Sequence, residues 1–115
     1  TRKVKAGYLA PYDTYKNRIA NLKFVQDIPL EPSAQSYSVM LNIENNIKQF
    51  SKLPIIIIWG REDFCFNKFF LDKWRRFFPL AEVHEVDGAG HLVVEDACEE
   101  IIPWMRAFLQ RNNTH

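Results

Sequence analysis

Residues 53–64 read LPIIIIWGREDF, and this stretch decides the fold class. Four consecutive isoleucines and Trp59 lie between Pro54 and Gly60, two residue types that commonly bound regular elements. A short β-branched run is a poor helix, and it is typical of a strand that is covered on both faces, as in parallel α/β sheets. The sequence therefore predicts a central strand over residues 55–59.

A helix and a second strand are predicted after this strand. Segment 67–78 places Phe70, Trp74 and Phe77 on one helical face. Segment 81–88, AEVHEVDG, is short and mixed in polarity, as strands near a sheet edge are. Together with a closing helix, this order is the βαβα order of a parallel sheet.

The closing helix is predicted over residues 96–111. Asp96 and Glu99 have the spacing of a capping box, so Asp96 is the predicted N-cap. Pro103 lies inside the pattern and should kink the helix or mark its true beginning.

Two further helices are predicted in the first half of the chain. The first covers residues 12–27, with Asp13 or Thr14 available as N-cap, and the second covers 36–50, with Ser36 as N-cap. Two strands alone leave both sheet edges open and cannot cover the isoleucine run. We therefore expect an α/β chain that is part of a larger domain.

Composition excludes several classes of protein. The 115 residues carry a net charge of +1, which gives no general attraction for nucleic acid or anionic lipid. Cys65 and Cys98 suggest neither a metal site nor a disulfide framework, so we expect reduced thiols in a cytoplasmic protein. No apolar run reaches the roughly 18 residues of a membrane span, and we expect a soluble chain.

Two titratable residues follow the two predicted strands. Asp63 lies in WGREDF and His91 in DGAGHL, and in open α/β sheets functional residues gather at the carboxyl ends of strands. On neighbouring strands, loops of this length can bring the carboxylate to the imidazole, where it fixes the tautomer of a catalytic base. No serine stands in the G-x-S-x-G spacing of a nucleophile elbow, so the nucleophile is missing.

Other residues receive simpler interpretations. Glu62 is the rival acid and is expected to be solvated, and an acid outside the chain is a further alternative. His84 is expected to be an exposed strand residue, and His115 a disordered terminal residue. Cys65 is interpreted as a small apolar side chain, and no motif implies a metal.

The motifs match a known family. LPIIIIWGREDF, FFPLAEVHEVDGAGHLVVED and IIPWMRAFL, within residues 53–109, resemble the C-terminal end of α/β-hydrolases. Residues 8–30, YLAPYDTYKNRIANLKFVQDIPL, resemble the segment that leaves the helical cap in the haloalkane-dehalogenase-like branch, especially the β-lactone decarboxylases of bacterial olefin biosynthesis. The resemblance implies the end of a cap in residues 1–35 and the C-terminal part of the hydrolase core, with its last two parallel strands and their helices, in 36–115.

The resemblance also implies a function. The parent enzyme would cleave a small lipophilic substrate of haloalkane or β-lactone type through a covalent intermediate, without a cofactor. His91 would be the base and Asp63 the orienting acid, while Phe64 and Leu92 would face the substrate. The nucleophile, an aspartate in this branch, lies outside the chain, so the chain alone is expected to be inactive.

Alternatives remain open at this stage. The parent could be a serine esterase or an epoxide hydrolase of the same fold. The chain could instead be a non-catalytic piece that pairs its open strand edges with a second copy or with the missing N-terminal half. Four aromatic residues could line a lipophilic pocket or simply pack within the cap: Tyr8, Tyr12, Tyr15 and Phe24.

Overall fold

The computed structural model describes residues 1–113. These residues form two compact units, Thr1–Asn45 and a second unit that begins at Asn46. Each unit is described by itself. The predicted functional boundary at residue 35 stays a prediction.

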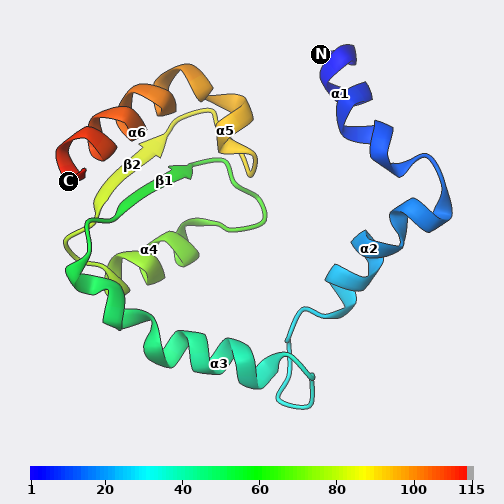
Figure 1. The fold of residues 1–115 in the computed structure, drawn as a ribbon, viewed down its shortest axis with the longest axis horizontal. Helices are drawn as coiled ribbons and strands as arrows, with labels where there is room; N and C mark the ends of the chain where they lie inside the picture. Colours follow the sequence, from blue (N-terminus) through cyan, green and yellow to red (C-terminus); the bar gives the residue numbers. More distant parts are fainter. Residues whose placement is uncertain (114–115) are drawn as a thin grey trace. The chain divides into compact units, whose positions relative to one another are not determined.

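The first unit consists of helices joined by turns (Figure 1). Their bounds are Arg2–Leu9 for α1, Ala10–Tyr12 for the 3₁₀ helix η1, Tyr15–Gln26 for α2 and Tyr37–Asn46 for α3. The predicted cap of α2 is confirmed, because the Thr14 hydroxyl accepts a hydrogen bond from the Asn17 amide at 3.2 Å. Helix α1 was not predicted from the sequence.

The first unit has no core of its own. None of residues 1–45, all of which the structure describes, is buried. The apolar side chains of α2 are largely open, with Tyr15 72% and Val25 65% exposed. The four aromatic residues proposed for a pocket or for cap packing are all exposed as well. No residue of α2 is buried.

The second unit contains the predicted parallel sheet. Strand β1, Ile56–Gly60, pairs with β2, Glu82–Val86, in a register that runs from Ile56 opposite Glu82 to Gly60 opposite Val86. Helix α4, Lys68–Phe77, lies on one side of this sheet and α6, Cys98–Asn112, on the other (Figure 1). The 3₁₀ helix η2, Ile47–Lys52, precedes β1, and the single turn α5, Val93–Asp96, precedes α6.

A small core lies between the second strand and α6. Val86, Ala89, Ala97 and Ile101 form one buried cluster, against which Ile58, Val93 and Trp104 pack. The side chains of β1 before Gly60 are only partly buried, although the isoleucine run predicts a strand covered on both faces. Two strands and two flanking helices offer too little surface to cover it, as expected from the sequence.

Two helices differ in detail from the sequence prediction. In α4 the buried residue is Leu71, 1% exposed, whereas Phe70 and Trp74 are each 38% exposed. The predicted helix 36–50 is divided, because α3 ends and η2 continues as a tighter helix. Side-chain periodicity identifies a helix but does not determine which stripe faces the core or where the helix tightens.

The predicted capping box of the closing helix is also wrong. Helix α6 begins at Cys98 with Ala97 at the N-cap position, and no side chain caps it. Asp96 instead ends α5, and its carboxylate accepts a hydrogen bond from the Gly90 amide. Pro103 lies inside α6, so it does not mark the beginning of the helix.

Within residues 1–113, no helix combines the length and the apolar character needed to cross a membrane.

Candidate active site

The two strands end side by side and send their loops from the same edge of the sheet. Gly60 and Val86 are paired in the register, and the chain continues the pairing beyond them. The Arg61 amide donates to the Val86 carbonyl at 3.0 Å, and the Glu62 amide donates to the Ala89 carbonyl at 2.9 Å. The loop after β1 is therefore joined to the loop after β2 by backbone hydrogen bonds.

Gly60 permits this close approach. A Cβ atom at this position would lie 2.3 Å from the Gly90 carbonyl oxygen and 2.5 Å from the Ala89 carbonyl oxygen. Both neighbours are backbone atoms, which cannot move aside as a flexible side chain can. The second loop also contains Gly88 at φ 72°, in the left-handed region that favours glycine.

The joined loops bring Asp63 and His91 together. His91 Nδ1 lies 3.1 Å from Asp63 Oδ2 and 3.2 Å from Oδ1. Asp63 Oδ1 also accepts hydrogen bonds from the backbone amides of Cys65 and Phe66, each at 2.8 Å. Two backbone amides of its own loop therefore hold the Asp63 carboxylate, in addition to its contact with the imidazole.

Burial and hydrogen bonding act on Asp63 in opposite directions. The Asp63 side chain is only 8% exposed, and this burial by itself raises the pKa of its carboxyl. The hydrogen bonds from the Phe66 amide, His91 and the Cys65 amide outweigh burial, so the pKa of Asp63 is lowered from its ordinary value. Asp63 is therefore an anion at neutral pH, and it favours a proton on Nδ1 of His91.

Comparison with known proteins gives close relatives of the chain. It is 46% identical over 109 residues to the cis-3-alkyl-4-alkyloxetan-2-one decarboxylase of Xanthomonas campestris pv. campestris, covering 95% of this chain and 36% of the relative. The enzyme of the same name from Shewanella oneidensis is 41% identical over 111 residues, covering 96% of this chain and 35% of the relative. The resemblance to the β-lactone decarboxylases is confirmed.

A more distant relative is an epoxide hydrolase, one of the alternatives left open by the sequence. Epoxide hydrolase 3 of Mus musculus is 28% identical over 102 residues, which cover 87% of this chain and 22% of that protein. No protein-family model and no solved structure matches the chain significantly. The chain spans about a third of the length of its decarboxylase relatives. Its helices and two parallel strands are consistent with the C-terminal part of an α/β-hydrolase.

A small hollow opens beside the Asp63–His91 pair. Its volume is about 180 Å³, and its lining includes Ile58, Phe66 and Val93 together with the pair itself. The centroid of the Phe66 ring lies 5.3 Å from that of His91. Phe66 was not predicted from the sequence. Its position follows from a local turn in which the Asp63 side chain accepts hydrogen bonds from the amides of the residues two and three positions further on.

The two predicted substrate residues are both exposed. The Phe64 ring centroid is 6.1 Å from that of His91, and Phe64 is 89% exposed. Leu92 directly precedes α5 and is 54% exposed. Both side chains present apolar surface to solvent, and their contact with a substrate stays a prediction.

The other residues discussed in the sequence analysis do not take part in the Asp63–His91 hydrogen bond. Glu62 is exposed, as predicted. His84 is partly buried and stacks on Trp104 with ring centroids 4.2 Å apart, so the prediction of an exposed strand histidine is wrong. Cys65 is an exposed free thiol and does not pack as an apolar side chain. His115 lies outside the described residues.

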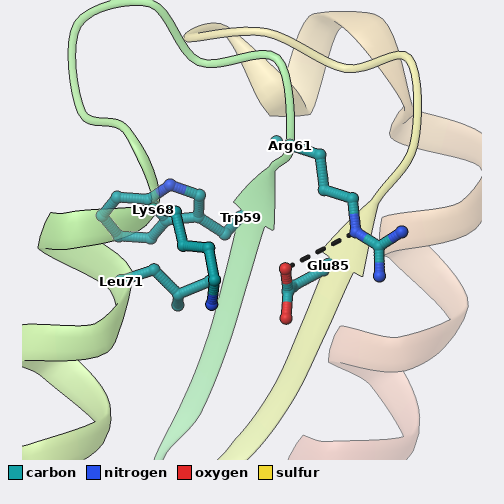
Figure 2. A pocket seen from close by; sticks show the side chains of 6 residues that line it. Trp59, Arg61, Lys68, Leu71 and Glu85 are labelled. Carbon is teal, nitrogen blue, oxygen red and sulfur yellow. Dashed lines mark ion pairs between the residues drawn. The ribbon is translucent and has the colours of Figure 1, made fainter.

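A larger hollow of about 430 Å³ lies nearby on the sheet and holds a different set of residues (Figure 2). Arg61 and Glu85 form an ion pair across it, with Arg61 Nε 3.5 Å from Glu85 Oε2, and Arg75 binds the same carboxylate at 2.5 Å. Neither Asp63 nor His91 lines it. The smaller hollow, which Asp63 and His91 line, is therefore the better candidate for chemistry.

Proposed function

We propose that the longer protein containing this chain opens a cis-3,4-dialkyl β-lactone and releases carbon dioxide. One observation carries this proposal: Asp63 and His91 form a hydrogen-bonded pair at the carboxyl ends of adjacent parallel strands. Nearly the whole chain in which they lie is similar to two decarboxylases named for such lactones. The dialkyl substrate is taken from the names of those relatives.

The geometry of the two residues supports the roles proposed for them. Asp63 occupies Nδ1 of His91, which leaves Nε2 to exchange a proton with a reacting oxygen. The buried carboxylate stabilises the imidazolium whenever His91 carries the extra proton. His91 is thus the general base or acid, and Asp63 is the residue that orients it.

The reaction needs a nucleophile from outside this chain. A carboxylate would attack the alkyl-substituted ring carbon bonded to the ring oxygen, so that this carbon–oxygen bond breaks, the ring opens and the ring oxygen becomes part of a free carboxylate. Loss of carbon dioxide then leaves its bonding electron pair to form the alkene, while the ester bond to the enzyme breaks and regenerates the nucleophile. Protonated His91 would stabilise the carboxylate that ring opening releases, and no cofactor is required.

Epoxide hydrolysis is the second candidate, because Epoxide hydrolase 3 is among the relatives of the chain. The same nucleophile would open the epoxide to an ester, and neutral His91 would take a proton from water to hydrolyse that ester. The product would be a diol, with one water consumed. The two functions therefore differ in product as well as in substrate.

The test uses the full-length protein and two substrates, a cis-3,4-dialkyl β-lactone and an epoxide of similar chain length. We expect alkene and carbon dioxide in equal amounts from the lactone, measured by gas chromatography with mass spectrometry. His91→Gln should abolish this turnover, whereas the matched variant His84→Gln should retain it, because His84 lies in the separate stack with Trp104. Diol formation without alkene would replace the first function by the second, and full activity of His91→Gln would overturn both.

A further inference from the structure

We propose that Asp96 is a positioning residue for the catalytic histidine, acting through the backbone of the preceding glycine. The inference rests on the proposed function for its consequences in catalysis. Asp96 Oδ2 accepts a hydrogen bond from the Gly90 amide at 2.9 Å, and Gly90 immediately precedes His91. Sequence spacing alone assigns this carboxylate to a helix cap, and the structure uses it here instead.

The hydrogen bond supports the residue that directly precedes His91. Gly90 has no side chain with which to pack, and the peptide that joins it to His91 sets the direction in which the imidazole leaves the backbone. An ionised acceptor makes a hydrogen bond about twice as strong as a neutral one. The Asp96 carboxylate is therefore suited to fix a flexible glycine at this position.

Both partners of this hydrogen bond are held by the same core. Ala89, which precedes Gly90, is 1% exposed, and Ala97, which follows Asp96, is 8% exposed. These two alanines pack in one cluster with Val86. Donor and acceptor thus lie next to anchored residues, so that little conformational entropy is lost when the hydrogen bond forms.

The turn α5 supplies the second support. The Asp96 amide donates to the Leu92 carbonyl at 3.1 Å, and the Ala97 amide donates to the Val93 carbonyl at 3.0 Å. These hydrogen bonds fold the segment after His91 back on itself, and its last carboxylate returns to the residue before His91. His91 therefore lies inside a short closed loop whose two ends are tied together.

The arrangement complements the contact made by Asp63. Asp63 fixes the imidazole through Nδ1, while Asp96 fixes the backbone from which the imidazole extends. The described contacts of Asp96 include none with the imidazole, so its effect on chemistry passes through Gly90. A displacement of about 1 Å can cost on the order of 100-fold in rate, which is why backbone support at this point has a catalytic consequence.

The experiment compares four variants of the full-length protein with the wild type. Asp96→Ala removes the acceptor, Asp96→Asn keeps a neutral acceptor of the same shape, and Asp96→Glu moves the carboxylate by one methylene. Glu99→Ala is the matched control, because Glu99 is an exposed acid three residues further on. The measurements are kcat and KM on the lactone, and the downfield NMR resonance of the His91 Nδ1 proton.

We expect Asp96→Ala to lower kcat by about 10- to 100-fold with KM changed less than about 3-fold. The Nδ1 proton resonance should shift or broaden in Asp96→Ala and Asp96→Glu. It should persist in Asp96→Asn and Glu99→Ala, which should also retain most of the turnover. A mere structural role would lower the folded fraction instead, without changing the resonance of the molecules that remain folded.

Unchanged kcat and an unchanged resonance in Asp96→Ala would overturn the inference. If Asp96→Ala does not fold, Asp96→Glu decides, and a wild-type resonance with wild-type kcat in that variant would equally overturn it. Failure of the proposed function is recognised separately, because the wild type would then form no alkene. In that case the resonance alone tests whether Asp96 positions His91.

Discussion

Nδ1 of His91 lies 3.1 Å from Oδ2 of Asp63, although the two residues are 28 positions apart in the chain. The distance depends on two adjacent strand ends and on a loop that fixes Asp63 through the amides of Cys65 and Phe66. The pair is therefore held from the acid side, with the acid largely buried and the histidine more open.

Replacing Asp63 by asparagine should lower kcat on the lactone by about 10⁴-fold, because a neutral amide that presents an N–H group to Nδ1 no longer stabilises the imidazolium that the lactone reaction uses. The carbonyl oxygen of the new side chain would still accept from the Cys65 and Phe66 amides, so the loop should keep its shape. Steady-state kinetics provide the measurement. Glu62→Gln, at an exposed neighbouring acid, should change kcat less than about 3-fold. Near-normal turnover of Asp63→Asn would assign the orienting acid to another residue.

Acid should lower the free energy of unfolding of the wild-type protein, because Asp63 becomes protonated. Because hydrogen bonds lower the pKa of Asp63 in the folded state, this group contributes stability above its unfolded pKa of about 3.9. That stability is lost as the pH falls through the lowered folded pKa. We expect the free energy of unfolding, measured in urea from pH 6 to pH 2, to fall less steeply below about pH 4 in Asp63→Asn than in the wild type. Parallel curves would contradict the depressed pKa.

The sheet and the pair could be predicted from the sequence because their signals are local. The isoleucine run identifies β1, and polar residues directly after each strand identify the edge at which Asp63 and His91 meet. Because the two strands are parallel, their carboxyl ends lie at the same edge of the sheet, and this places the two loops side by side. No long-range information beyond the strand order was needed.

The errors arise where a residue has two possible partners. Asp96 has the spacing of an N-cap, yet the loop after β2 offers it the Gly90 amide, and the helix begins later without a side-chain cap. His84 lies in a short segment of mixed polarity, which favours an exposed strand residue, but Trp104 of α6 stacks on it. Both choices depend on residues distant in sequence, which a local pattern cannot contain.

Gly60→Ala should destabilise the second unit by at least about 2 kcal/mol, because the new methyl group would lie 2.3 Å from a backbone carbonyl oxygen. Relief of this clash would separate the loops of Asp63 and His91, so turnover should also fall. Gly7→Ala is the matched control: a methyl group there meets nothing within 4 Å, and alanine favours the helix by about 1 kcal/mol. Urea denaturation and lactone turnover would be measured for both variants. Equal behaviour of the two would show that the loops do not approach as closely as described.

Trp104→Ala should lower stability without altering the chemistry. The indole stacks on the His84 ring at 4.2 Å between centroids and packs against the buried cluster of α6. The carboxylate of Glu82 binds His84 Nε2 at 2.7 Å and also binds Arg111 near the end of α6, so this group of side chains fastens α6 to β2. We expect a loss of about 2–4 kcal/mol for Trp104→Ala and a smaller loss for Trp104→Phe, which keeps a stacking ring. Thermal unfolding would give the stability, and kcat per folded molecule should stay at the wild-type value in both variants. A fall in kcat with an unchanged unfolding midpoint would mean that this stack, and not only the loops at the strand ends, acts on the catalytic pair.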